Sequence, residues 1–270
     1  MDPGEIGTQG FPLRVSSLPM LVKCPARIAI QMIENPERTS GPAADTGTAA
    51  HFAISSYHKG MIPDAAIAAM RSSVSAFPLA DLDEAEEFAR RYFRDPRNSQ
   101  EAVDPEKCEV QIAFRLPPHP TDPTGKEIFF QGTSDQVRTA SNGIAEVWDY
   151  KTGKDEGSVL VAEHLFQLAG YSRGAQETLG VTIGDSGIIR ARGYFRRDRA
   201  TPESEPPGVF FHSCLDHQQI EALLWRVRAT VAAIRRGEAW FGPSAACNHC
   251  PYEGTSVCVP RAISLGLRCS

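Results

Sequence analysis

Three consecutive segments with the alternating pattern of a β-strand occupy the middle of the chain, and they constrain its fold more than any other feature. They cover 109–116, 127–139 and 144–151, and Ser141-Asn142-Gly143 separates the last two. A short polar segment that ends in glycine is typical of a hairpin turn. The pattern therefore predicts antiparallel strands at the centre of the fold.

Helical periodicity marks the residues before these strands. A first helix is predicted to begin after Ser16 or Ser17, either of which can cap it. Its apolar positions are Leu18, Leu21, Ile28 and Ile30. Two more helices are predicted from about 45 to 57 and from about 80 to 93. The first hundred residues are therefore expected to be mainly helical.

The residues after the strands alternate between helix and strand patterns. The predicted elements are, in order, a helix at 158–179, strands at 188–195 and 209–212, and a helix between Asp216 and Gly237. Aspartate is a favoured helix N-cap and glycine a favoured helix stop. The whole order predicts an α/β fold in which helices flank a central mixed sheet.

The chain is predicted to form a single domain over 1–270, with three parts. They are an N-terminal helical part, a sheet core, and a C-terminal helix with clustered cysteines, at 12–100, 101–213 and 214–270. Hydrophobic residues make up 41% and charged residues 23%, which is the composition of a globular protein. The proline-rich stretches 117–123 and 201–207 are predicted loops between strands, not domain boundaries.

No stretch of the sequence approaches the roughly 18 consecutive apolar residues of a membrane helix. Met1–Gly10 also lacks the basic and apolar regions of a signal peptide. We therefore expect a cytoplasmic protein with no membrane partner, in which clustered cysteines are metal ligands and not disulfides. The net charge of −5 says little about a nucleic-acid partner, because binding depends on local charge.

Two carboxylates and an amine are expected to meet on the predicted hairpin. Residues two apart on a strand share a face, so Asp149 and Lys151 point the same way. A three-residue turn at 141–143 would place Asp135 opposite Asp149, whereas a two-residue turn would pair Asp135 with Tyr150. Convergence of the carboxylates therefore predicts the three-residue turn, or a bulge that restores its register.

Such a pair of carboxylates suits a hard divalent cation. Magnesium and manganese prefer oxygen ligands, and such an ion can neutralise charge on a phosphodiester. Lys151 could then orient or deprotonate the attacking water. The alternative is that Asp135, Asp149 and Lys151 are only solvated charges on the surface of a hairpin.

Further short motifs surround these residues. Gly132 precedes Asp135, His51 ends the sequence Gly47-Thr48-Ala49-Ala50-His51, and Gln167 and Tyr171 lie four apart on the predicted helix. His51 alone would fit a buried, hydrogen-bonded histidine, and the Gln167–Tyr171 stripe could be ordinary surface. Cysteines occur near both ends of the chain, at Cys24, Cys247, Cys250 and Cys258.

Together and in this order, the motifs resemble the PD-(D/E)XK nuclease superfamily. The residues that flank them resemble its RecB-like branch, which includes the AddB nuclease domain and the CRISPR-associated RecB-like exonucleases. The resemblance runs from about Ser16 to Cys258 and implies a restriction-endonuclease-like core. It implies that magnesium or manganese is held by His51, Asp135, Asp149 and the backbone carbonyl of Tyr150. It also implies that Lys151 activates water and that Gln167 and Tyr171 hold the nucleic-acid strand.

The cysteines allow two metals. The sequence Cys247-Asn248-His249-Cys250 alone is typical of a zinc site, which Cys258 would help to complete. The resemblance instead implies a [4Fe-4S] cluster bound by Cys24, Cys247, Cys250 and Cys258. Either metal would join the N-terminal and C-terminal helical parts.

The sequence thus supports two functional hypotheses. The first is a metal-dependent DNA nuclease, an exonuclease acting on single-stranded DNA or DNA ends, with a helicase, integrase or recombination protein as partner. The second is a non-catalytic DNA-end-binding or adaptor subunit of a repair or CRISPR adaptation complex.

Three groups of arginines could line a channel for a phosphate backbone, or they could simply be solvated surface charges. They are Arg90, Arg91, Arg94 and Arg97, then Arg196, Arg197 and Arg199, and then Arg226, Arg228, Arg235 and Arg236.

Overall fold

A mixed sheet lies at the centre of the computed structural model, as predicted. The structure describes residues 2–34, 41–95, 98–100, 104–139, 144–151, 162–190, 209–212, 215–240 and 250. Within these ranges the sheet has six strands, β1 (Leu13–Arg14), β2 (Cys108–Leu116), β3 (Ile128–Thr139), β4 (Ala145–Lys151), β5 (Ile183–Arg190) and β6 (Val209–His212). The path β1-β3-β4-β5-β6 contains parallel and antiparallel pairs, and β2 pairs with β3 beside it.

The register between β3 and β4 is the one that a three-residue turn predicts. Gln136 pairs with Trp148 and Val137 with Val147, and one step beyond this ladder the same register puts Asp135 opposite Asp149. β5 begins at Ile183, five residues earlier than predicted. The earlier start follows from its parallel pairing with β4, whose first residue, Ala145, pairs with Ile183. Residues 191–195 of that predicted strand lie outside the described residues.

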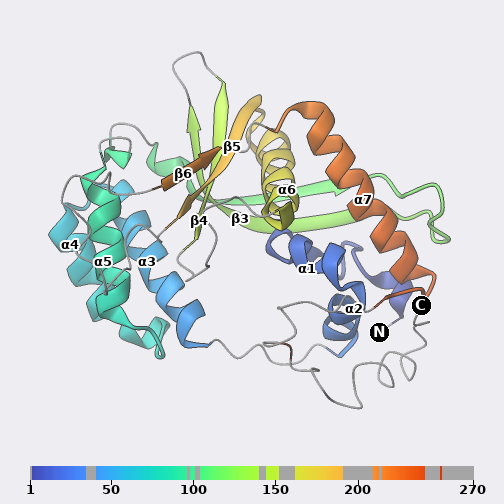
Figure 1. The fold of residues 1–270 in the computed structure, drawn as a ribbon, viewed down its shortest axis with the longest axis horizontal. Helices are drawn as coiled ribbons and strands as arrows, with labels where there is room; N and C mark the ends of the chain where they lie inside the picture. The colour runs from blue at the N-terminus through green and yellow to red at the C-terminus, as the bar shows by residue number, and fades with distance from the viewer. Residues whose placement is uncertain are drawn as a thin grey trace.

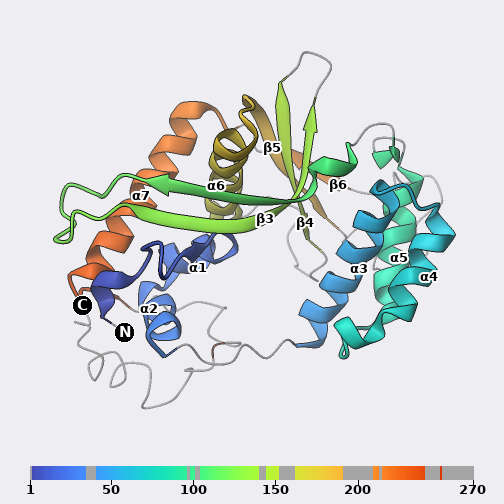
Figure 2. The same cartoon turned by 180° about the vertical axis from the view of Figure 1, so that it is seen from behind.

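Helices cover the sheet from two sides (Figures 1 and 2). α3 (Pro42–His58), α4 (Pro63–Ser72) and α5 (Leu82–Arg94) gather at one end of the molecule. α6 (Ala162–Leu179) and α7 (His217–Arg235) pack against each other over the other side of the sheet, where Figure 2 shows α6 behind the long β2–β3 ribbon. α4 was not predicted from the sequence. No helix within the described ranges is long and apolar enough to cross a bilayer.

The first predicted helix is in fact two helices. α1 (Leu18–Lys23) ends at Cys24, whose backbone is not helical, and α2 (Pro25–Glu34) begins immediately after it. Proline disfavours a helical conformation in the residue before it and has no N–H to continue the helix, so Pro25 forces the break. Ser17 is the N-cap residue of α1, but its hydroxyl donates to the carbonyl of Arg14 and caps no helix N–H.

Side chains of the sheet contribute to two hydrophobic cores. The larger core contains Val137, Ala145 and Val147 together with apolar residues of α1, α2, α6 and α7. The smaller core contains Trp148 and Tyr150 together with apolar residues of α3, α4 and α5. Successive residues of β4 therefore face different helices, because side chains alternate along a strand. This alternation leaves Asp149 on the opposite face from Trp148 and Tyr150.

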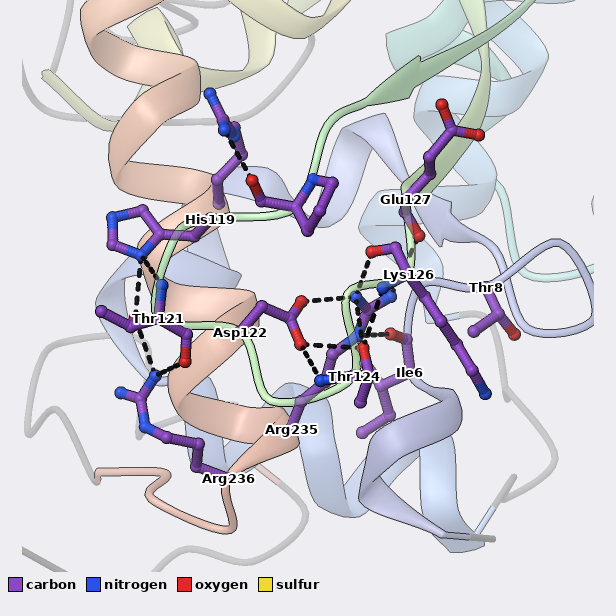
Figure 3. Close-up of polar contacts among 12 residues, drawn as sticks. Ile6, Thr8, His119, Thr121, Asp122, Thr124, Lys126, Glu127, Arg235 and Arg236 are labelled. Carbon is purple, nitrogen blue, oxygen red and sulfur yellow. Dashed lines mark hydrogen bonds and ion pairs between the residues drawn. The ribbon is translucent and has the colours of Figure 1, made fainter.

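A buried arginine near the end of α7 links this helix to two distant segments of the chain (Figure 3). Asp216 and Gln219 form a capping box at its start, and Gly237 with a φ of 75° ends it, as predicted. Near its end, Arg235 Nη1 lies 2.6 Å from Asp122 Oδ2, and both side chains are 0% exposed. Arg235 also donates to backbone carbonyls of both the N-terminal segment and the β2–β3 connection, namely Ile6, Lys126 and Glu127.

Candidate functional site

The two predicted carboxylates lie side by side on neighbouring strands. Asp135 on β3 and Asp149 on β4 are 8% and 3% exposed, and their strands are paired in antiparallel register. Lys151 follows two residues later on β4, and its Nζ lies 2.7 Å from Asp149 Oδ2. The strand alternation thus brings the two acids and the amine to one place.

A histidine from α3 joins these groups, although it is far away in the sequence. His51 Nδ1 lies 3.4 Å from Asp135 Oδ1. α3 packs on the sheet through small residues of the smaller core, among them Ala49, Ala50 and Ala53, which let the helix approach closely. The structure therefore brings His51, Asp135, Asp149 and Lys151 together.

Glu109 also belongs to this cluster, and sequence reasoning missed it. Its Oε1 lies 3.7 Å from His51 Nδ1, and ligand atoms of His51, Glu109 and Asp135 all lie within 4.8 Å of one another. Glu109 adopts a left-handed backbone with a φ of 54°, which is uncommon for a residue with a side chain. In the β2–β3 ladder it lies opposite Asp135, between the pairs Cys108–Gln136 and Val110–Ser134, a register that the sequence alone did not predict.

The cluster carries more negative than positive charge, and the pKa values reflect this. Burial opposes the charged form of His51, but the adjacent Asp135 carboxylate outweighs burial and, with Glu109, raises the pKa of His51 to about 10. Burial, aided by repulsion from Asp135 and opposed by Lys151, raises the pKa of Asp149 to about 6. These groups therefore favour any further positive charge at this place. Carboxylate oxygens with one imidazole nitrogen are a donor set that suits magnesium or manganese.

The predicted glutamine and tyrosine of α6 also reach the carboxylates. Gln167 Nε2 donates to Asp149 Oδ1 at 3.3 Å, and Gln167 Oε1 accepts from Lys151 Nζ at 3.0 Å. One turn later on the helix, Tyr171 Oη accepts a hydrogen bond from Gln167 Nε2 at 2.9 Å. Gln167 thus fixes the positions of both Asp149 and Lys151.

Tyr150 supports the cluster from behind. Its backbone N–H donates to Asp135 Oδ2 at 2.6 Å, and its ring packs edge-on against the ring of His51 with centroids 5.3 Å apart. Its hydroxyl lies 3.1 Å from that of Tyr92 on α5, which in turn lies 2.9 Å from His58 Nε2 on α3. This buried chain of polar groups ties two helices to the strand that carries Asp149.

His58 in this chain makes stability depend on pH. Burial, and then the charge of Arg138, lowers the pKa of His58 to about 4. In the unfolded chain a histidine has a pKa of ~6.5, so between these values the unfolded state binds more protons and stability falls as the pH falls. We expect this residue to contribute a loss of about 3 kcal/mol across that range.

The measurement is the free energy of unfolding in urea at neutral pH and near pH ~4.5, for the native sequence and for His58→Gln. Carboxylates add their own pH dependence to both proteins, so the difference between the two slopes isolates His58. A pH dependence that His58→Gln leaves unchanged would refute this assignment.

Most described arginines of the predicted channel have structural partners instead. On α5, Arg90 pairs with Asp64 and Glu86, and Arg91 pairs with Glu87. On α7, Arg235 is buried against Asp122, Arg236 pairs with Glu238, and Arg228 donates to the carbonyl of Pro118. These side chains therefore do not converge on the carboxylates. Arg97 and the cluster at 196–199 lie outside the described residues.

Two of the four predicted cluster cysteines can be placed. Cys24 lies at the break between α1 and α2 and is half-buried, and Cys250 is half-buried against the larger core. The N–H of Ala26 donates to the carbonyl of Trp240, so the start of α2 lies beside the segment that follows α7. Cys247 and Cys258 lie outside the described residues.

Comparison with known proteins gives a family and a fold. The model of the PD-(D/E)XK nuclease superfamily matches residues 12–258. A crystal structure of a candidate exonuclease from Eubacterium rectale aligns with a TM-score of 0.52 at 15% identity, covering 90% of this chain and 88% of that one. The crystal structure of SSO0001 aligns with a TM-score of 0.40 at 16% identity, covering 90% and 87%, a score too low to establish a common fold. No curated protein matches the sequence.

Proposed function

The chain belongs to the PD-(D/E)XK nuclease superfamily, and from this premise we propose that it is a metal-dependent deoxyribonuclease. The observation that carries the proposal is the meeting of His51, Asp135, Asp149 and Lys151, which come from one helix and two strands. Burying two carboxylates beside an amine costs free energy of folding, and such clusters of buried ionisable groups are typical of functional sites.

We propose that His51, Asp135, Asp149 and the carbonyl of Tyr150 hold Mg²⁺ or Mn²⁺. Glu109 is a further ligand candidate, because its carboxylate oxygen lies within 4.8 Å of an imidazole nitrogen of His51 and a carboxylate oxygen of Asp135. The donor set fits a hard cation, and the raised pKa values of His51 and Asp149 are those of a site that favours added positive charge. A bound divalent ion supplies an acidic water and neutralises charge on the phosphate.

The side chains around the carboxylates position the reactants. Hydrolysis requires a water oxygen to attack phosphorus while the bond to the leaving oxygen breaks, and the leaving oxygen takes up a proton. Lys151 Nζ, held by Asp149 and Gln167, is placed to donate hydrogen bonds to the attacking water and to a phosphate oxygen. Gln167 bonds to both the amine and the carboxylate and so holds them in a defined relation to each other.

For the substrate we propose single-stranded DNA or DNA ends, and for the branch the RecB-like nucleases. The support is the Gln167–Tyr171 pair beside Asp149, together with His51 on a helix of sequence Gly-Thr-Ala-Ala-His. An exonuclease of this kind would depend on a helicase, integrase or recombination partner, since the sequence contains no phosphate-binding Gly-Lys-Ser/Thr loop.

We also propose that Cys24, Cys247, Cys250 and Cys258 bind a [4Fe-4S] cluster. The contact of Ala26 with Trp240 supports this, because it brings the chain next to Cys24 beside the segment that leads to Cys247. Zinc is the alternative metal that these four thiolates could bind. Anaerobic purification with a visible spectrum and metal analysis distinguishes them, because a cluster is brown and contains iron.

Incubation of the purified protein with end-labelled single-stranded DNA tests the proposed function. We expect degradation in Mn²⁺ or Mg²⁺ and none after chelation of the metal, with activity restored when metal is added back. Binding of DNA without cleavage in any divalent metal would refute the nuclease and identify a DNA-end-binding adaptor. Labels at the two ends in turn give the direction of digestion.

A further inference from the structure

A groove of about 690 Å³, lined by both polar and apolar residues, lies over β1, β2 and β3 beside α6. Its lining side chains include Ser16, Gln111, Gln131, Thr133 and Tyr171, which offer neutral hydrogen-bonding groups. Arg14 is the one charged residue among the described lining residues, and no carboxylate is among them. The groove therefore combines a single cation with amides and hydroxyls.

The groove leads directly to the candidate site along three elements. On β3, Thr133 in the groove is two residues from Asp135, and on β2, Gln111 is two residues from Glu109. Gln111 Nε2 donates to Thr133 Oγ1 at 2.9 Å, which joins the two strands at this point. On α6, Tyr171 lines the groove and binds Gln167, which contacts Asp149 and Lys151. A ligand that leaves the carboxylates in this direction enters the groove.

Arg14 lies in the part of the groove that is farther from the carboxylates. It pairs with Gln131 in the β1–β3 ladder, four residues from Asp135, which corresponds to ~13 Å along a strand. Its side chain is exposed, and within the described ranges it forms no ion pair, unlike Arg90, Arg91 and Arg235. A guanidinium without a carboxylate partner is suited to bind a phosphate.

The size of the groove selects the form of the ligand. A volume of about 690 Å³ equals that of a cube about 9 Å on edge, whereas a whole duplex is wider than its ~12 Å major groove alone. The groove therefore has room for a single strand but cannot enclose a duplex. We propose that the groove holds the single strand that leads away from the scissile bond, with Arg14 on one of its phosphates. The proposal rests on the proposed nuclease function and names the substrate-binding surface for it.

The test compares Arg14→Gln with Arg115→Gln. Arg115 is also exposed and lies on β2, but it is outside the groove and pairs with Glu127 at 3.3 Å, so its substitution removes the same charge elsewhere. We expect Arg14→Gln to weaken binding of a long single strand about tenfold, with kcat changed less than twofold. Loss of one phosphate contact should also reduce the slope of log K against log salt by about 0.7. A dinucleotide, too short to span the groove, should bind both variants and the native protein equally.

Binding is measured by fluorescence anisotropy with Ca²⁺ in place of Mn²⁺, so that the result does not depend on cleavage. Equal binding of the long strand by Arg14→Gln and Arg115→Gln would overturn the groove proposal and leave the nuclease assignment intact. Absence of cleavage by the native protein would overturn the nuclease assignment. In that case the binding data would still test the groove. Weaker binding of the long strand by Arg14→Gln than by Arg115→Gln, with equal binding of the dinucleotide, would show that the strand lies in the groove.

Discussion

Replacing Asp149 by asparagine is expected to lower the rate of DNA cleavage by about 10³-fold or more, equivalent to ~4 kcal/mol of transition-state stabilisation. Asp149 Oδ2 contacts the Lys151 amine, Asp149 Oδ1 contacts Gln167, and the strand register places the residue next to Asp135. Asparagine keeps the shape of the side chain but loses the negative charge, so the amine loses its ion pair and the proposed cation would lose a ligand.

The matched control is Glu146→Gln, the same change of carboxylate to amide on the same strand. Glu146 accepts a hydrogen bond from Trp148 Nε1 at 3.0 Å and lies outside the carboxylate cluster, so its variant should cleave DNA at nearly the native rate. Thermal unfolding of both variants within a few degrees of the native protein establishes that the fold is kept. Comparable cleavage by Asp149→Asn and the native protein would show that the reaction takes place elsewhere.

Replacing Arg235 by methionine is expected to reduce the free energy of unfolding by about 3–5 kcal/mol. The guanidinium and Asp122 are both fully buried, and Arg235 also satisfies backbone carbonyls of two other segments. Burial opposes the charge of Asp122, but hydrogen bonds from Thr124 and Arg235 outweigh it and lower its pKa. The methionine variant would leave this carboxylate buried without its cation. For a chain of this size the change corresponds to a fall in Tm of roughly 6–20 °C.

Arg236→Met removes a neighbouring arginine from the same helix end and should cost less than about 1 kcal/mol. Arg236 pairs with Glu238 at the surface and donates to the carbonyl of Thr121, and exposed pairs of this kind contribute little. Adding Asp122→Asn to Arg235→Met should recover part of the lost stability, because the uncompensated charge is then gone. Equal unfolding free energies for Arg235→Met and Arg236→Met would contradict the structural role of the buried pair.

Local rules were sufficient to predict the strands. The alternating pattern predicts β2, β3 and β4 to within a residue. The Ser-Asn-Gly segment allowed two registers between β3 and β4, and the expected convergence of Asp135 and Asp149 selected the one that the structure has. Asp216 and Gly237 likewise mark the ends of α7, because caps act over a single turn. In each case the signal lies within a few residues of the structure that it determines.

Features that depend on distant contacts could not be predicted in this way. Glu109 joins the carboxylate cluster because the β2–β3 register places it opposite Asp135, and the long connection between these strands has no tight turn from which the sequence could predict that register. Arg235 looks like one more surface charge in the sequence, but two segments far from it in the chain, the N-terminal segment and the β2–β3 connection, enclose it. The break between α1 and α2 has a local signal in Pro25, but the apolar pattern continues across it, and a single helix was therefore predicted.

The central claim is that His51, Asp135 and Asp149 surround one divalent ion, and anomalous diffraction from crystals soaked in Mn²⁺ tests it most directly. The account predicts a strong anomalous peak within coordination distance of the His51 imidazole and the two carboxylates, and loss of that peak in Asp149→Asn or a marked drop in its occupancy. The claim would be contradicted by an anomalous peak elsewhere in the molecule and none between these three side chains, at a Mn²⁺ concentration that supports cleavage.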